Sequence, residues 1–437
     1  MGEHRPLIEE DKDYIIDDNI GDEDAIEGVN ENGRNLSDYE TFFNVSNGIM
    51  GTGLLAMGFV FRCAGIWALI IVPVIAVAGN YTGKLLITLL YTRDKHGKMI
   101  RTRAGYVDIG ESFCPYFGRV FVNIVNFIEN FAHAILILLM AGGVMNEIVP
   151  VITDDVWSVL CAMPLLSIVF LDSIKSLSRI AMATVFTGAA LVIIAAAYSL
   201  TFSANWGRTF KSAVSLSLKN SSLAIGITVV TYACQPYLPF IEKDMLNRKH
   251  FNKVMNLSYT LVTILKLFTG FFVYMAYENL THPLMTLDLP NGPLRTISSL
   301  FLLVVALTFF FFPMFTVFNI VDENWPKDKW DRTTLRYFVR TVILVLALII
   351  AVVTPHFGLG IALVGNFTAN ILVFIVPCAC HLKFNYPNLS FKEMLADVII
   401  LVAATIFGCI GIVFSVLELI VSSNDEDLNP TEPLEHL

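Results

Sequence analysis

Charge is scarce in this chain of 437 residues: Asp, Glu, Lys and Arg make up 15% of it, and hydrophobic residues 55%. A composition so poor in charge excludes an ordinary soluble domain, in which about 25% of residues are charged, and also a disordered chain. Uncharged runs recur along the sequence, for example at 180–202 and 398–417. A bilayer core of about 30 Å takes roughly 20 apolar residues per helical crossing. The sequence therefore predicts a polytopic membrane protein.

Other features are missing as well. The seven Cys have no CxxC spacing, so neither a disulfide framework nor a zinc site is expected. The first forty residues are polar and acidic and contain no apolar h-region, so no cleavable signal peptide is expected. No phosphate loop, HExxH motif or metal-spaced His cluster is present. We therefore expect no enzyme activity, no metal or other cofactor and no nucleic-acid partner.

The apolar runs predict an all-α membrane protein with eleven transmembrane helices, because helices satisfy every backbone polar group within one crossing. The expected spans are 40–61, 65–91, 118–147, 156–172, 179–202, 222–242, 254–278, 295–320, 336–355, 359–382 and 395–421. This organisation gives three parts. We expect a disordered acidic cytosolic tail at 1–39, a transporter domain at 40–421, and a short acidic lumenal tail at 422–437.

Positive charge is distributed unequally between the two sets of connecting loops. One set contains most of the basic residues: Arg93, Lys95, Lys98, Arg101, Arg103, Lys175, Arg179, Lys243, Arg248, Lys249, Lys253, Lys327, Lys329, Arg332, Arg336, Lys383 and Lys392. The other set has few, and cytoplasmic loops are the ones enriched in Lys and Arg. This predicts a cytosolic N-terminus and a lumenal C-terminus. Asn220 and Asn279 then form glycosylation sequons on the lumenal side.

The first span looks interrupted. Gly48, Gly51 and Gly53 fall within six residues, directly after Asn44, Ser46 and Asn47. Glycines permit unusual backbone angles, and a helix that restarts beyond a break presents N–H groups suited to a carboxylate. The alternative is close helix packing through small residues.

The sixth span also looks interrupted. Pro236 and Pro239 each remove a backbone donor, and the polar Tyr232 and Gln235 lie at the same depth. A simple proline kink is the alternative. Two interrupted spans five helices apart match the centre of a five-plus-five inverted-repeat transporter. We expect a substrate carboxylate near Gly51 and Gly53, with the remainder of the substrate facing Tyr232 and Gln235.

Several fragments in order resemble one family. They are Asn44-Val-Ser-Asn47, Tyr81-Thr-Gly-Lys-Leu-Leu86, Gly118-Arg119-Val120 with a later Glu129, 170–178, Gly226-Ile with Tyr232, Gln235, Leu238-Pro239 and Glu242, 254–256 through Lys266, and Pro355-His356-Phe357. Together they resemble the amino acid/auxin permease superfamily, and within it the vesicular inhibitory amino acid (GABA and glycine) transporters and their vacuolar relatives.

The resemblance implies an eleven-helix inverted-repeat fold and amino acid transport coupled to the proton gradient of an acidic compartment. It also has departures. The family's first helix usually continues as Leu-Pro-Tyr-Ala, whereas this chain has Gly58 and Phe59 in place of the proline and tyrosine. Loss of a hydroxyl near a site changes discrimination between substrates. A small neutral amino acid other than GABA or glycine therefore stays open.

Three ionisable residues inside the spans need a reason, because a charge at mid-bilayer costs about 2.5–3.5 kcal/mol or more. Glu129 and His133 lie four residues apart on one helix face, and Lys266 lies in the middle of the seventh span. These three are the candidates for proton coupling. The alternative for Glu129 is a structural ion pair with Lys84 or Lys266. The aromatic run 309–312 is expected to face lipid rather than to form a gate.

Near the N-terminus, Glu3, Leu7 and Ile8 fit an acidic dileucine-type sorting signal, which a coat adaptor would bind; an ordinary acidic tail is the alternative. The sequence thus predicts a vesicular or lysosomal transporter that loads a small amino acid in exchange for protons, with chloride or sodium as further candidate ions and membrane lipid as its surroundings. Sodium- or proton-coupled uptake at the plasma membrane is the alternative. A channel is the alternative from another class.

Overall fold

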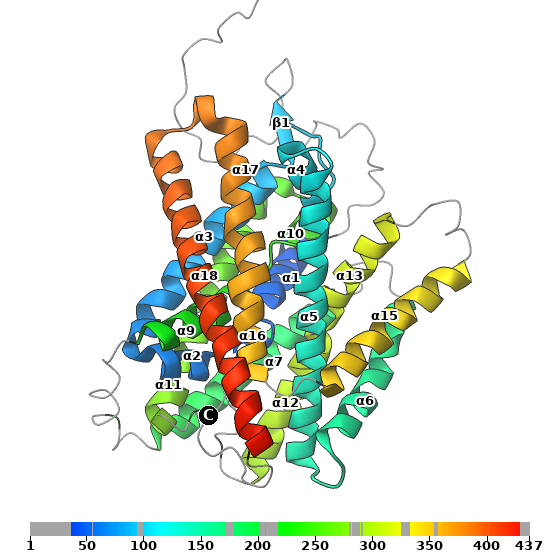
Figure 1. Ribbon diagram of the computed structural model, residues 1–437, viewed down its shortest axis with the longest axis vertical. Helices are drawn as coiled ribbons and strands as arrows, with labels where there is room; N and C mark the ends of the chain where they lie inside the picture. Colours follow the sequence, from blue (N-terminus) through cyan, green and yellow to red (C-terminus); the bar gives the residue numbers. More distant parts are fainter. Residues whose placement is uncertain are drawn as a thin grey trace, which may run out of the picture.

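The computed structural model describes residues 36–54, 56–93, 99–170, 178–201, 206, 217–278, 281, 289, 292–324, 333–353 and 357–428. The predicted sorting signal (Glu3, Leu7, Ile8) and the sequon residue Asn279 lie outside these residues. The helices are α1 (Asp38–Met50), α2 (Met57–Ala64), α3 (Ala68–Thr88), α4 (Tyr106–Phe113), α5 (Phe117–Ile148), α6 (Asp154–Leu165), α7 (Ser178–Leu200), α9 (Leu218–Val230), α10 (Leu238–Asp244), α11 (Phe251–Tyr277), α12 (Pro293–Phe309), α13 (Phe311–Asn324), α15 (Thr333–Val353), α16 (Phe357–Val364), α17 (Val376–Asn385) and α18 (Phe391–Leu428). A short antiparallel hairpin, β1 (Tyr91–Arg93) with β2 (Met99–Arg101), completes the fold (Figure 1).

Within the described residues, eight helical stretches are long and apolar enough to cross a membrane: Met57–Thr88, Phe117–Ile148, Ser178–Leu200, Arg248–Tyr277, Pro293–Asn324, Thr334–Val353, Leu359–Asn385 and Phe391–Val421. The expected first, fourth and sixth spans instead contain shorter helices, because each is interrupted or ends early. The all-α, multi-pass class is therefore confirmed, and the total of eleven crossings stays a prediction.

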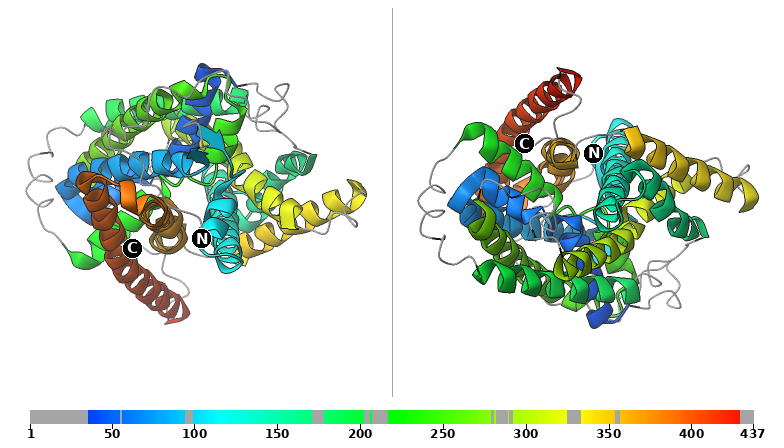
Figure 2. Two further views of the ribbon diagram at one scale, coloured as in Figure 1. Left: turned by 90° about the horizontal axis from the view of Figure 1, so that it is seen from above. Right: turned by 90° about the horizontal axis from the view of Figure 1, so that it is seen from below.

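Burial separates a central helix from peripheral ones. In its most apolar stretch, α5 is 67% buried, whereas α15 and α18 are only 22% buried. Figures 1 and 2 show α15 and α18 on the outside of the bundle. Apolar side chains on the outer helices therefore face lipid, and α5 is placed to carry polar groups away from it.

The first span is broken after α1. Ser37 and Glu40 form a capping box at the start of this helix, and Gly51 ends it with φ 38°. A 3₁₀ turn, Thr52–Leu54, leads into α2. A β-carbon on Gly53 would lie 2.2 Å from Cβ of Thr231, which real atoms cannot do. The glycines thus serve both expectations, since they allow the break and the close approach of two helices.

The sixth span is broken between α9 and α10. Buried residues 231–237 join the two helices without regular helix. Pro239 lies in the first turn of α10, where a missing N–H does no harm. Because α2 packs against α9, and α1 against α10 and α11, the two breaks lie next to each other in the centre of the bundle (Figure 1).

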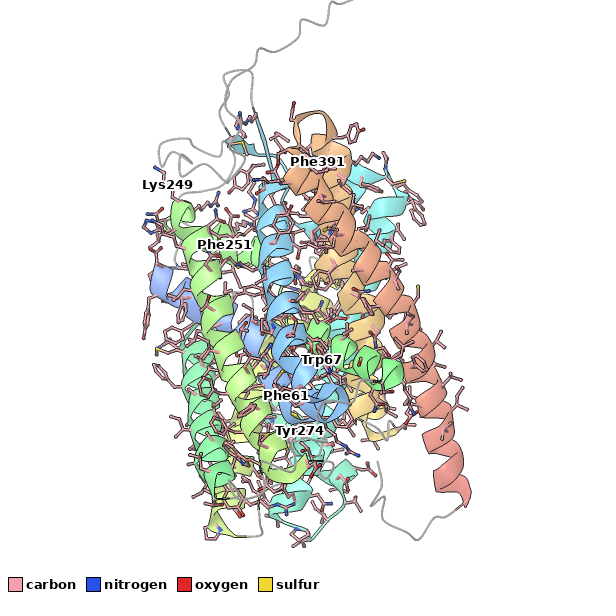
Figure 3. All side chains as sticks on the ribbon, turned by 90° about the vertical axis from the view of Figure 1, so that its left-hand side faces the viewer. Phe61, Trp67, Lys249, Phe251, Tyr274 and Phe391 are labelled. Atoms are coloured by element: carbon pink, nitrogen blue, oxygen red, sulfur yellow. The ribbon has the colours of Figure 1, made fainter. Side chains whose placement is uncertain are left out.

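Among the described residues, the hairpin β1–β2 and the connection from α17 to α18, both from the basic set of loops, lie at one end of the molecule (Figure 1). Figure 3 places Lys249 and Phe391 at the same end, and Tyr274 towards the other. Leu36 joins this end too, since its N–H donates to Asp244 O and its carbonyl accepts from Leu246 N, both at 2.9 Å. This grouping agrees with the charge pattern. Which end faces the cytosol stays a prediction.

The boundaries of the tails shift slightly. The folded part begins before residue 40, because Leu36 is fully buried and α1 starts at Asp38. At the other end α18 continues to Leu428, past the expected limit of 421. The predicted sequon Asn220 is exposed near the start of α9, beside Lys219, whose Nζ lies 2.5 Å from Glu418 Oε2.

Candidate functional site

A row of polar side chains follows one face of α5. Asn126, Glu129, Asn130 and His133 recur at helical spacing, and each is at most 5% exposed. A polar face on the most buried helix is costly unless its groups are partnered or used. This face is therefore the natural place to look for function.

Glu129 has an incomplete set of partners. The Thr368 hydroxyl donates to Oε2, and His133 Nδ1 lies 3.8 Å from Oε1. Among the described residues, Oε1 has no hydrogen-bond partner. The alternative prediction that Glu129 pairs with Lys84 or Lys266 is wrong: Lys84 Nζ donates to Asn256 Oδ1 at 2.5 Å instead, and Lys266 binds elsewhere.

Thr368 reaches Glu129 from an unusual turn. It lies in a π-helical segment, Gly365–Ala369, between α16 and α17. A π turn inserts an extra residue and redirects side chains, and such turns are frequent at functional sites. No pattern in the sequence indicated Thr368 as a partner of Glu129.

Tyr237 is a second residue that sequence reasoning missed. Its hydroxyl donates to Asn130 Oδ1 at 2.8 Å, and its ring meets Phe312 edge-on with centroids 5.7 Å apart. Since it ends the sixth-span break, it connects that break to α5. The Gln-Pro-Tyr order, with an aromatic directly after the proline, is the signal that could have indicated it.

The aromatic run lies inside the protein. Phe309, Phe310 and Phe312 are at most 2% exposed, so the expectation of a lipid-facing run is wrong. A β-carbon on Gly51 would lie 2.8 Å from the Phe309 ring, and that ring also meets His133 edge-on at 5.5 Å. The missing side chain at Gly51 is what makes room for this ring in the centre.

Lys266 extends from α11 between the two breaks. Its Nζ donates to Ile49 O (2.9 Å), Thr231 O (2.6 Å) and Thr231 Oγ1 (3.0 Å). It also lies 3.6 Å from the centroid of the Tyr232 ring, a cation–π distance. The residue is fully buried. It therefore joins the end of α1 to the end of α9.

Tyr232 and Gln235 make their contacts with α11 and α3. The Tyr232 hydroxyl pairs with Thr263 Oγ1 at 2.9 Å on α11. Gln235 Nε2 donates to Gly79 O of α3 at 3.3 Å, and its Oε1 has no partner among the described residues. In this conformation both side chains hold the sixth-span break against α3 and α11, and their predicted contact with substrate stays a prediction.

Three residues of α1 are fully buried and poorly satisfied. Asn44 Nδ2 donates to Ser178 Oγ at 2.9 Å, but Asn44 Oδ1 has no partner among the described residues. The same holds for Ser46 Oγ and for both amide atoms of Asn47. Buried polar groups almost always have partners, so such a group calls for an explanation. Asn47 lies one turn before Gly51 and thus on the same face.

The two breaks touch each other directly. Two cavities occur in the described part of the chain, one of about 200 Å³ lined by Glu147, Ile148, Gly292, Arg295 and Thr296, the other of about 340 Å³ by Ser37, Tyr39, Glu40, Phe43, Ser178, Arg179 and Met182. Direct contact of Gly53 with Thr231 keeps the two breaks together. Access between the breaks therefore requires the helices to move. No group of three His, Cys, Asp or Glu that could hold a metal occurs in the described ranges.

Solved structures share this architecture. One match is MhsT in complex with L-phenylalanine, with a TM-score of 0.59 and 15% identity over 86% of this chain and 98% of that one. A Na⁺-coupled sialic acid symporter matches with a TM-score of 0.52 and 13% identity, over 86% of this chain and 90% of its own. At such identities the likeness shows the fold alone.

The sequence identifies the family. The family described as "Transmembrane amino acid transporter protein" matches residues 34–421, so the chain belongs to it. Relatives include the "Vesicular inhibitory amino acid transporter" of Xenopus tropicalis, 28% identical over 88% of this chain and 77% of that protein, and that of Homo sapiens, 27% identical over 93% and 82%. "Amino acid transporter AVT1J" of Arabidopsis thaliana is 23% identical over 93% and 97%. The predicted superfamily is confirmed, and the chain is a multi-pass amino acid transporter.

Proposed function

We propose that this transporter moves a small neutral amino acid into an acidic vesicular or endolysosomal lumen in exchange for protons. The substrate binds between the two breaks, against Asn44, Ser46 and Asn47 on α1 and Tyr237 on the other side. The names of the vesicular relatives support the compartment. Glu129 and His133 carry the proton.

One observation carries the substrate site: fully buried polar atoms without partners border the first break. Both amide atoms of Asn47 are unpaired among the described residues. An amide offers a donor and an acceptor together, which suits the carboxylate and the ammonium of one zwitterion. The glycines at 51 and 53 leave backbone within reach of the carboxylate, and Tyr232, Gln235 and Lys266 hold the shape of the break.

Glu129 suits a proton carrier because its environment serves both protonation states poorly. Oε1 has no partner among the described residues, and the nearest basic group is His133 at 3.8 Å, beyond hydrogen-bond distance. A change of rotamer or helix position would exchange these partners for others. Each pH unit across the membrane supplies about 1.4 kcal/mol per proton, and each 100 mV about 2.3 kcal/mol per charge.

The test is uptake of a panel of labelled amino acids into proteoliposomes with the pH gradient imposed in either direction. We expect accumulation into an acidic interior, abolished by a protonophore. Accumulation driven only by a sodium gradient would move the protein to the plasma-membrane alternative. Passive flux without accumulation would make it a channel.

A pair of variants tests the site. Asn47→Ala removes both unpaired amide atoms and should raise KM at least tenfold, about 1.4 kcal/mol of binding. Asn388→Ala, at an exposed amide near the start of α18, is the control and should stay within twofold. Equal KM values for the two variants would contradict the placement of the substrate.

A further inference from the structure

The two central breaks leave backbone carbonyls without their usual helical partners. In a continuous helix, Ile49 O would accept from residue 53, and Thr231 O from residue 235. Because α1 ends at Met50 and α9 at Val230, neither bond can form in regular geometry. Both carbonyls lie at helix C-termini, which carry partial negative charge.

Lys266 Nζ satisfies both of these carbonyls and Thr231 Oγ1. The Thr231 hydroxyl already donates its hydrogen to Thr228 O at 2.8 Å, so it can only accept from Lys266. All three neighbours are thus acceptors, and they use the three hydrogens of an ammonium group. A neutral amine would instead point its lone pair at an acceptor. The geometry is that of a bound cation.

Carboxylates take no part in this arrangement. Lys266 forms no ion pair within the described residues. Glu129, on α5, lies beside His133 instead. Its charge is balanced by two helix ends, a hydroxyl and the face of Tyr232. Transporters of this fold class use freed carbonyls and helix C-terminal ends at the same kind of break to coordinate a coupling Na⁺ or H⁺.

We infer that the Lys266 ammonium is a tethered cation that fills the central cation site of this transporter, so that no sodium ion binds there. The inference rests on the proposed function, in which protons are the coupling ion. It deepens that proposal by removing sodium from the candidate ions at this site. It also makes a specific claim about the residue. The side chain of Lys266, rather than the helices around it, sets the selectivity for the ion.

Two substitutions separate charge from space. Lys266→Ala removes the charge and leaves room between the helix ends. Lys266→Met also removes the charge but fills the room with an apolar chain of similar length. Only the alanine variant should therefore offer sodium the two carbonyls and the hydroxyl.

The first measurement is the Tm of the purified full-length protein in detergent, in NaCl and in choline chloride at equal concentration. Sodium binding stabilises the folded state by mass action. We expect NaCl to raise the Tm of Lys266→Ala by about 2 °C or more, and to leave wild type and Lys266→Met unchanged within about 0.5 °C. Should Lys266→Ala not fold, Lys266→Ser keeps the same space and takes its place.

The second measurement is uptake by the same proteins in proteoliposomes. Wild type should be indifferent to the exchange of sodium for choline, whereas Lys266→Ala should be at least fivefold more active with sodium. A Tm of wild type that depends on sodium would overturn the inference. So would a folded Lys266→Ala, or Lys266→Ser in its place, whose Tm does not depend on sodium. Because the Tm requires no transport, a wild type that takes up no amino acid would refute the proposed function alone.

Discussion

Two buried carboxylates in this protein have very different surroundings. Glu242, at the end of α10, is 1% exposed; its Oε2 lies 2.7 Å from Arg101 Nη1, its Oε1 3.4 Å from Arg248 Nε, and Tyr91 donates a hydrogen bond to it. Burial, together with the charge of Glu242, raises the pKa of Tyr91, so this phenol stays a donor. Glu129, 2% exposed, has a hydroxyl and a distant imidazole.

The difference separates a carboxylate with a structural role from the one proposed to carry protons. Glu242, with two cations and a phenol as partners, fixes the hairpin β1–β2 to the end of α10. Glu129 has one oxygen without a partner among the described residues, and it is the group to which the proposed function assigns the proton. The same residue type thus joins elements at one end of the protein and, under the proposed function, carries the proton at the centre.

The largest expected effect on transport comes from Glu129→Gln. This variant keeps the size of the side chain and the bond from Thr368 but removes the proton site. We expect accumulation driven by an imposed pH gradient to fall at least tenfold. Exchange of labelled for unlabelled substrate, which needs no net proton movement, should stay within about threefold. Normal pH-driven uptake in this variant would exclude Glu129 as the carrier. Glu111→Gln, at a half-exposed carboxylate paired with Arg119, is the matched control.

Glu242→Gln should have the opposite character. Removing one partner of a buried ion pair leaves Arg101 and Arg248 uncompensated, which costs about 3–5 kcal/mol. Chemical denaturation should report this loss, and proton coupling in the protein that remains folded should be kept. The exposed pair lost in Glu111→Gln contributes about 0–1 kcal/mol. Equal stability of the two variants would show that the buried cluster does not hold this end closed.

Gly53→Ala tests how tightly the two breaks meet. The added carbon would overlap Thr231, and overpacking of this kind costs about 1–3 kcal/mol. Because the strain falls between the two breaks, we expect the transport rate of the folded protein to fall in addition to its stability. Gly143→Ala, on α5 with nothing within 4 Å of the new carbon, should stabilise its helix by about 0.5–1 kcal/mol. Similar transport rates in both variants would contradict the close contact.

The smallest effect on transport is expected from Tyr237→Phe, which deletes only the hydroxyl that donates to Asn130. An unsatisfied buried acceptor costs about 1–3 kcal/mol. A modest fall in Tm and a several-fold rise in KM should follow if the bond positions both the break and α5 for substrate. Tyr39→Phe, at an exposed ring on α1, is the control. An unchanged KM would leave Tyr237 a purely structural residue.

Local chemistry carried most of the fold prediction. Uncharged runs predicted the helical crossings, and Gly51, Gly53 and Pro236 predicted both interruptions, because these residues act on the backbone where they stand. Partners could not be predicted in the same way. Thr368 meets Glu129 across a sequence separation of 239 residues, and Tyr237 meets Asn130 across 107. The aromatic run was misjudged because hydropathy is equal for a ring facing lipid and one facing Gly51.

The backbone bridge at Leu36 has a mechanical consequence. Leu36 lies just before α1, and its partners Asp244 and Leu246 lie at the end of α10. Two backbone hydrogen bonds therefore join the outer ends of the two half-helices. The inner ends of the same half-helices meet the two breaks. Because these bonds join their far ends, α1 and α10 would have to move together if either turned at its break. Opening this end of the transporter is then one joint swing of the pair, and any load on the N-terminal segment acts directly on it.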